Sequence, residues 1–323
     1  MDKGGYPVEE ESFRTENGFL LAQSDGCSVY QFHNDTGDGT MTCYEVFPGA
    51  MLSFNDFHVA HFDSAYVPGR NMFVIDHCRE GKMEYLAAEN AYAYVGAGDI
   101  KMDRRLTHTG RFIFPSSHYH GLTIAFDMEI AASALSKEVK DFPIDLTALQ
   151  QKYCPGRYPH VLREMGAAEH IFGELYQVPG KIRIPYFKIK IMELLLYLDA
   201  LELPKEQKER PYYYKTQIEK VKAIQAFLAG HMAENYTQEQ LSARFEIPLT
   251  GMKNCFKSVY GTSIGAWLTD YRMNRAAEFL RADREQSVAE IAGLVGYDSA
   301  SKFAIAFRKI MGMSPLEYRN AIY

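Results

Sequence analysis

The spacing of apolar residues changes about halfway along this chain. Up to about residue 130, short apolar runs alternate with Gly, Pro, Asn and Asp, a pattern typical of β-strands joined by turns. The clearest predicted strands are Cys43–Phe47, Asn71–Ile75, Tyr92–Val95, Arg111–Phe114 and Leu122–Phe126. Many short strands with aromatic residues predict a barrel or double-sheet sandwich over about residues 19–130.

From about residue 145 to 203 the apolar positions follow a helical period. We predict helices over Leu146–Tyr153, Pro159–Tyr176 and Ile184–Leu203. The last of these carries one apolar stripe, formed by Ile184, Phe187, Ile191, Leu194, Leu195 and Leu198. Such a stripe either packs on its own barrel or contributes to a dimer interface, and the sequence leaves both interpretations open. We therefore treat residues 145–203 as a predicted helical dimerisation segment.

A break in the pattern follows, and the rest of the chain is predicted to be helical. Residues 204–215 are rich in charge and contain two prolines, which favours a linker. Residues 1–203 and 216–323 are then the two predicted domains. In the second domain, helices are expected at about 216–232, 237–245, 249–259, 263–282, 287–295, 299–311 and 314–322.

One pattern occurs twice in this helical region. The first copy reads Thr237-x-x-Gln240-Leu241, then Met252-x-x-x-Phe256, then Gly261-x-Ser263. The second copy reads Ser287-x-x-Glu290-Ile291, then Phe303-x-x-x-Phe307, then Gly312-x-Ser314. Each copy begins with a capping box and continues through a short break into a second amphipathic helix. Two such helix-turn-helix patterns in tandem predict a DNA-binding module.

The second helix of each copy has a polar, basic outer face. The residues predicted to face DNA are Thr250, Lys253, Asn254 and Lys257 in the first copy and Ser299, Ser301, Lys302, Ile305, Arg308 and Lys309 in the second. Asn and Ser can bond base edges, and Lys and Arg neutralise phosphates. The helix that joins the copies is about 30 Å long, close to the roughly 34 Å between successive major-groove faces.

Composition supports this division of the chain. The 323 residues suffice for two domains, and the net charge of −6 separates into +4 for residues 205–323 and −10 for the remainder. An acidic half joined to a basic half fits a sensor attached to a nucleic-acid binder. Five cysteines without a CxxC motif favour reduced thiols and a cytoplasmic location. No signal peptide is evident, and the most apolar stretch, Ile189–Leu203, is too charged to span a membrane.

The segment from Phe256 to Asn320, with its core SVAEIAGLVGYDSASKF…FRKIMGMSPLEYR, resembles the AraC/XylS family of bacterial transcription regulators. The resemblance covers about residues 216–322 and implies seven helices with two helix-turn-helix units that read adjacent major grooves. It also implies an effector-binding, cupin-like barrel before the helical dimerisation segment, an outline that residues 19–203 fit. Members of this family often carry Arg two residues before the helix Phe, where this chain has Asn254 and Ile305. Ile305 can contact a thymine methyl but cannot bond a base edge.

A group of ionisable residues in the β-rich half is the predicted ligand site. It comprises His58, Arg79, Glu80, His118 and His120, and we expect an organic effector there. His118 and His120 alternate with one residue, so both rings would share a strand face and could ligate a metal. The cupin metal pattern requires a Glu a few residues later, and none follows before Glu129. We therefore assign no metal and no cofactor, and a structural or pocket-lining role for these residues stays open beside ligand binding.

The sequence favours a transcription regulator of mixed α+β fold over an enzyme. No GxSxG, Walker, GxGxxG or HExxH motif is present. A cupin-type metal-dependent enzyme fused to a DNA-binding domain is the alternative. The expected partners are promoter or operator double-stranded DNA, a small-molecule effector and a second copy of the chain, with RNA polymerase as a further partner and no membrane.

Overall fold

The computed structural model describes residues 18–24, 26–64, 71–106, 110–138, 142–163, 166–203, 212–282 and 285–321. The chain divides into two compact units, Met1–Tyr212 and Tyr213–Tyr323. The first contains an antiparallel sheet with helices and the second is helical, so the predicted α+β class is confirmed at this level. Most of the predicted linker, residues 204–211, lies outside the described residues.

The first unit is built on antiparallel strands. In chain order they are β1 (Gly18–Ser24), β2 (Cys27–Asn34), β3 (Gly37–Phe47), β4 (Ala50–His58), β5 (His61–Asp63), β6 (Met72–Ala88), β7 (Ala91–Gly96), β8 (Ile100–Asp103), β9 (Arg111–Ile113), β10 (Tyr119–Asp127) and β11 (His160–Leu162). The main path is β1-β2-β3-β4-β10-β6-β7, with β8 paired to β6, β11 to β8 and β5 to β9. The five predicted strands fall on β3, β6, β7, β9 and β10.

Four α-helices accompany this sheet: α1 (Met128–Glu138), α2 (Leu146–Tyr153), α3 (Gly166–Leu175) and α4 (Arg183–Ala200). The predicted helix over Pro159–Tyr176 is wrong in its first part, because Val161 pairs with Lys101 and extends the sheet through β11. Pairing of β11 with the edge of β8 has overridden the helical preference of the local sequence there. Helix α1 was not predicted.

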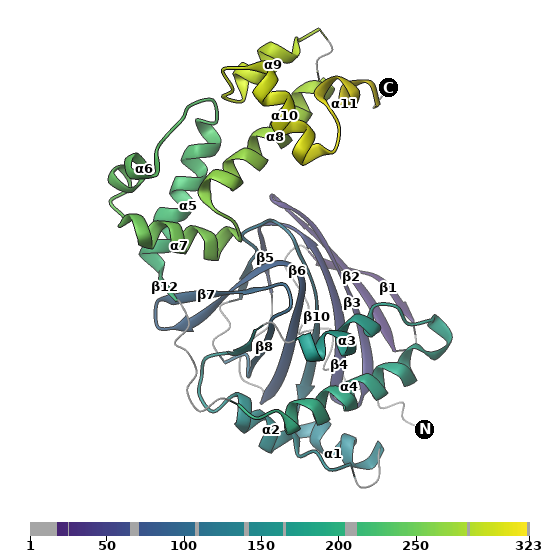
Figure 1. Cartoon of the computed structure of the whole chain (residues 1–323). Coiled ribbons are helices and arrows are strands. Elements are labelled where there is room, and N and C mark those ends of the chain that lie inside the picture. Colours follow the sequence, from purple (N-terminus) through teal and green to yellow (C-terminus); the bar gives the residue numbers. More distant parts are fainter. Residues whose placement is uncertain are drawn as a thin grey trace. The chain divides into compact units, whose positions relative to one another are not determined.

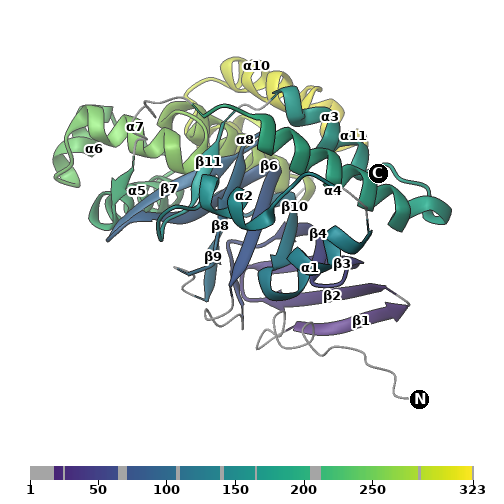
Figure 2. The same cartoon turned by 90° about the horizontal axis from the view of Figure 1, so that it is seen from below.

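The two faces of the sheet pack against different groups of residues. One face packs against α2, α3 and α4, and its core includes Leu52, Ile75 and Ile124 from the strands (Figures 1 and 2). The apolar stripe of α4 lies in this core, since Phe187, Ile191, Leu194, Leu195 and Leu198 are all buried within their own chain. These five residues therefore cannot form a dimer interface, and the interpretation that they pack on their own sheet is confirmed.

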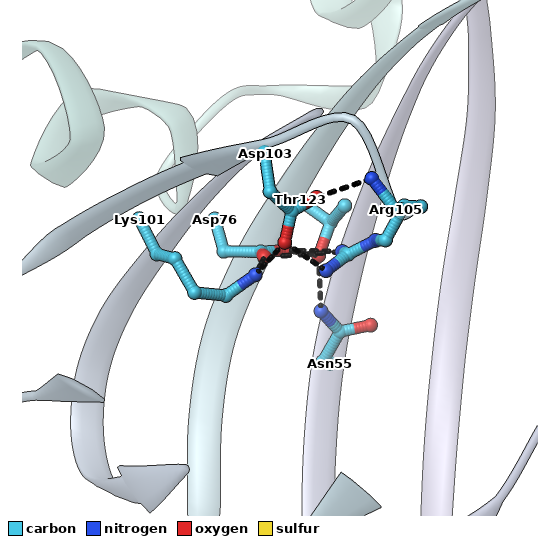
Figure 3. Close-up of polar contacts among 6 residues, drawn as sticks. All are labelled: Asn55, Asp76, Lys101, Asp103, Arg105 and Thr123. Atoms are coloured by element: carbon cyan, nitrogen blue, oxygen red, sulfur yellow. Dashed lines mark hydrogen bonds and ion pairs between the residues drawn. The ribbon is translucent and has the colours of Figure 1, made fainter. Parts of the chain in front are cut away.

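The opposite face carries a second apolar cluster and a buried ionic network. The apolar cluster includes Phe32, Phe57, Phe62 and Phe114. The network joins six side chains from β4, β6, β8, β10 and the turn after β8: Asn55, Asp76, Lys101, Asp103, Arg105 and Thr123 (Figure 3). Two carboxylates thus face two cations inside the domain.

Asp76 is the centre of this network. It accepts from Lys101 Nζ at 2.7 Å, from Arg105 Nη2 at 3.0 Å and from Thr123 Oγ1 at 2.7 Å. The side chains of Asp76 and Lys101 are each only 3% exposed. Burial opposes ionisation of Asp76, yet the charges of Arg105 and Lys101 outweigh it and hold the pKa of this carboxyl below its usual range. Asn55 completes the network by donating to Thr123 at 3.1 Å.

Removing the Asp76 charge should strongly destabilise the first unit. Asp76→Asn leaves Lys101 and Arg105 with one buried carboxylate between them, a loss that typically costs about 3–5 kcal/mol. The matched control is Asp63→Asn, which breaks the exposed pair with Arg111 and should cost below about 1 kcal/mol.

Urea unfolding followed by far-UV circular dichroism measures this effect. Tryptophan fluorescence provides the internal reference, because the single tryptophan, Trp267, lies in the second unit. Equal midpoints for the two variants would contradict the assigned importance of the network.

The second unit begins with the short strand β12 (Tyr213–Tyr214) and continues through seven helices. They are α5 (Lys215–Gly230), α6 (Gln238–Arg244), α7 (Leu249–Tyr260), α8 (Ile264–Ala282), α9 (Val288–Leu294), α10 (Ala300–Met311) and α11 (Pro315–Ala321). Each predicted helix of this region is present at the expected position. Helix α8 packs against α7 as well as against α9, α10 and α11, and therefore joins the two halves of the unit.

Candidate nucleic-acid interface and polar cluster

The two predicted helix-turn-helix units, α6–α7 and α9–α10, begin with the expected capping boxes. Thr237 Oγ1 accepts from the backbone N–H of Gln240 at 3.2 Å, and the Gln240 side chain accepts from the Thr237 N–H at 2.8 Å. Ser287 and Glu290 make the same two bonds at 3.1 and 2.7 Å. The caps pair backbone N–H groups that lack partners at a helix start, so they fix where α6 and α9 begin.

The turns of the two units share a backbone feature that the repeat alone did not reveal. Glu246 has φ of 50° and its counterpart Gly296 has φ of 79°. A Cβ at position 296 would lie 2.8 Å from the carbonyl oxygens of Met232 and Ala233, so the second turn has space only for glycine. Gly261 and Gly312 end α7 and α10 with φ near 80°, as left-handed helix caps do.

The apolar sides of α7 and α10 are buried and their predicted outer sides are exposed. Met252 and Phe256 of α7, like Phe303 and Phe307 of α10, are completely buried. Of the ten residues predicted to face DNA, nine are exposed: Thr250, Lys253, Asn254, Lys257, Ser301, Lys302, Ile305, Arg308 and Lys309. Ser299 is half-buried because its hydroxyl caps α10, accepting from the Lys302 N–H at 3.5 Å.

The five residues predicted to bind a ligand in the first unit also come together. His58 and His118 approach through their Nδ1 atoms at 3.4 Å, and Nε2 of His118 lies 3.4 Å from Glu80 Oε2. The Arg79 guanidinium stacks on the Tyr176 ring at 4.4 Å, and the His120 ring meets the edge of Tyr176 at 5.4 Å. These side chains lie on the sheet face that the helices cover.

Two side chains beside this cluster have buried polar atoms without a hydrogen-bond partner among the described residues. Both ring nitrogens of His77 are unpaired, and its ring stacks flat on Phe172 of α3 at 4.1 Å. Tyr176, one helical turn beyond Phe172, has an unpaired hydroxyl. Burial, assisted by the charge of Arg79, lowers the pKa of His77 to about 4, and burial raises the pKa of Tyr176.

Sequence reasoning missed Phe172, Tyr176 and the unpaired state of His77. Phe172 and Tyr176 are four residues apart, so the sequence indicated a shared helix face. It could not indicate that this face lies over His77 and Arg79, because that contact depends on how α3 docks on the sheet.

Among the described residues, no group of three or more His, Cys, Asp or Glu side chains converges as a metal site.

Comparison with known proteins assigns the second unit. A family model described as a helix-turn-helix domain matches residues 241–321. The regulator ExsA of Pseudomonas aeruginosa is 31% identical over 100 residues, which are 31% of this chain and 36% of that protein. A putative AraC-like transcription regulator of Streptomyces antibioticus is 31% identical over 94 residues, 29% of this chain and 31% of its own. The chain thus matches about a third of the length of these relatives.

The second unit is an AraC/XylS-type helix-turn-helix domain. Among solved structures, the C-terminal domain of the response regulator AraT from Geobacillus stearothermophilus is 32% identical. That match covers 32% of this chain and 84% of that chain, with a TM-score of 0.31. The matched curated relatives carry names of transcription regulators and not of enzymes, in agreement with the prediction. No helix within the described residues combines the length and hydropathy needed to cross a membrane.

Within the AraC/XylS-type domain, helices α7 and α10 differ at their centres. Asn254 is exposed on α7 and offers both a donor and an acceptor. At the corresponding site on α10, Ile305 is 72% exposed and apolar. An isoleucine so exposed in the middle of an amphipathic helix adds little to the core of the unit.

Acid should weaken the first unit through His77. Its pKa of about 4 in the folded state lies below the ordinary value near 6.5. The folded unit then binds fewer protons than the unfolded chain between these pH values, so stability falls as the pH drops from about 6.5 to 4, by about 2–4 kcal/mol. His77→Phe keeps the ring on Phe172 and should remove this loss.

Circular-dichroism melts at several pH values test the assignment. The exposed control, His33→Gln, should retain the wild-type pH dependence. Loss of stability as steep as in the wild type for His77→Phe between pH 6.5 and 4 would show that another group is responsible, with His120, whose pKa burial also lowers, as the candidate. Asp76 and Asp103, with their lowered pKa values, lose their contribution only at lower pH.

Proposed function

We propose that the protein is a cytoplasmic, sequence-specific transcription regulator whose α7 and α10 read two adjacent major grooves. The observation that carries this proposal is the equivalence of the two helix-turn-helix units. Both present an exposed polar helix face, and both are held by α8. Helix α8 has 19 residues and is therefore about 28 Å long, comparable to one turn of B-DNA.

Phosphate contacts should dominate the affinity. Lys253, Lys257, Lys302, Arg308 and Lys309 lie on the exposed faces of the two helices. If about five phosphates are contacted, the slope of log K against log salt should be about −4 to −5 for the isolated second unit on duplex DNA. Fluorescence anisotropy at several salt concentrations measures it. The double variant Lys253→Ala, Lys257→Ala should reduce the slope by about 2, and a flat dependence in the wild type would refute the proposal.

The two helices should contribute unequally to sequence specificity. Asn254→Ala removes a side chain that can bond adenine in a bidentate manner, and should cost about 1–3 kcal/mol on the preferred site. Ile305→Ala should cost less and act only where a thymine methyl is read. Selection of binding sites from randomised duplexes shows the asymmetry directly. Equal information content in the two halves of the selected DNA site, or equal losses of binding free energy in the two variants, would contradict this asymmetry.

For the first unit we infer a cupin-like barrel that senses a small effector. Supporting this, one sheet face is sealed by helices while the other encloses apolar and ionic side chains, as the inside of a small barrel does. The effector site that the observations support best lies around Arg79, His120 and Tyr176, where unpaired polar atoms of Tyr176 and His77 are available. Binding there would shift the arrangement of DNA-binding domains in a dimer and their access to RNA polymerase.

The dimer contact belongs on the exposed side of α4 and not on its predicted stripe. Ile182, just before the helix, Ile189 and Leu196 are exposed and seven residues apart, which places them on one line. Pro185, which is also exposed, lies between Ile182 and Ile189 on the same side and adds to the apolar surface there. A face of this kind fits a second copy related by twofold symmetry.

A charge at the centre of this face should separate the dimer. Ile189→Glu leaves the core of the unit untouched, because Ile189 is 57% exposed, and should give a monomer in sedimentation velocity at micromolar concentration. The matched control is Leu316→Glu, which places the same charge on a similarly exposed leucine of α11. A dimeric Ile189→Glu protein, or a monomeric wild type, would remove α4 from the interface.

A further inference from the structure

A cross-strand pair of histidines in the first unit has the geometry of a metal chelate. Phe57 of β4 pairs with Tyr119 of β10, so the next residues outward, His58 and His118, stand opposite each other at the end of the ladder. Their side chains are 58% and 33% exposed, which leaves them accessible from solvent. Their Nδ1 atoms are 3.4 Å apart.

Each imidazole has a carboxylate at its other nitrogen. Nε2 of His58 lies 3.1 Å from Asp56 Oδ1, and Nε2 of His118 lies 3.4 Å from Glu80 Oε2. A carboxylate accepts, so the hydrogen-bond partners favour the tautomer with the proton on Nε2, in which each Nδ1 presents a lone pair. Two lone pairs that face each other without a proton repel, and a cation between them removes the repulsion.

The separation of the two nitrogens matches that of two ligands on one metal ion. With Zn–N bonds of about 2.0–2.1 Å, the edge of a tetrahedron is about 3.3–3.4 Å. The arrangement of carboxylate, imidazole and metal is the one in which outer partners fix the tautomer and orientation of metal-binding histidines. Asp56 and Glu80 together with Arg79 also give the immediate surroundings a net negative charge, which favours a cation.

We propose that His58 and His118 bind a divalent transition-metal ion of the kind imidazole prefers, Zn²⁺, Ni²⁺ or Cu²⁺, through their Nδ1 atoms. Asp56 and Glu80 are positioning residues in this site. No further His, Cys, Asp or Glu of the described residues completes the coordination sphere. The remaining positions are therefore open to water or to a small chelating molecule. This site is additional to the proposed regulation of transcription, because DNA binding by the second unit does not require it.

Titration of the full-length, tag-free protein with Zn²⁺ alone tests the proposal. Competition with a chromophoric chelator should show one ion per chain. His58→Gln and His118→Gln should each weaken this binding by more than tenfold, because the one remaining imidazole cannot chelate the ion. Glu80→Gln, which removes only an outer partner, should weaken it by about tenfold.

The controls separate this site from other donors on the chain. His33→Gln changes an exposed histidine outside the pair and should bind Zn²⁺ as the wild type does. The five cysteines, four of them buried, are present in every variant and cannot produce a difference between them. Absence of Zn²⁺ binding, or equal binding by wild type, His58→Gln and His118→Gln, would overturn the proposal. Salt-dependent DNA binding by His58→Gln should be unchanged, so failure here is distinguishable from failure of the proposed function.

Discussion

One side of helix α8 is buried against both halves of the second unit, and the positions of α7 and α10 relative to each other depend on that burial. Met273, Ala276, Ala277 and Leu280 enter the core that holds Phe303 and Phe307 of α10. Toward its start, α8 packs against α7, and Trp267 meets the edge of Phe256 at 6.1 Å. The shared helix thus fixes the positions of α7 and α10 relative to each other, because neither helix can move without disturbing a core that contains α8.

Arg272 reinforces this constraint from the middle of α8. It is buried and donates to the backbone carbonyls of Met232 at 2.7 Å and Glu234 at 2.8 Å. These carbonyls lie in the segment after α5, so one side chain ties α8 to the first half, while its guanidinium would clash with any Cβ at Gly296 of the second half. Arg272 therefore restricts the position of the segment after α5 and the choice of residue in the turn between α9 and α10. In the first unit, Asp76 has a comparable role, since its contacts with Lys101, Arg105 and Thr123 join β6 to β8, to the turn after β8 and to β10.

The sequence predicted the second unit well because its signals are local. Caps such as Thr237/Gln240 and Ser287/Glu290, and terminating glycines such as Gly261, act within a few residues. The first unit depends on contacts between residues far apart in sequence. The β11 pairing, the docking of Phe172 and Tyr176, and the burial of Lys101 with Asp76 cannot be read from spacing. The predicted ligand residues did gather, because alternation along β4 and β10 constrains which side chains share a face. The interpretation of the α4 stripe as a dimer interface was wrong. An apolar stripe does not reveal whether the surface that it packs against belongs to the same chain.

We expect α8 to hold α7 and α10 against one side of the duplex, one helical turn apart. Hydroxyl-radical footprinting of the isolated second unit on its selected site measures this arrangement most directly. Two protected segments are expected on the same face of the DNA, with centres about 10 base pairs apart. Inserting about five base pairs between the two halves of the site should abolish one protection, because a rigid α8 cannot follow the rotation. A single protected segment on the uninterrupted site, or two protections that survive the insertion, would contradict the account.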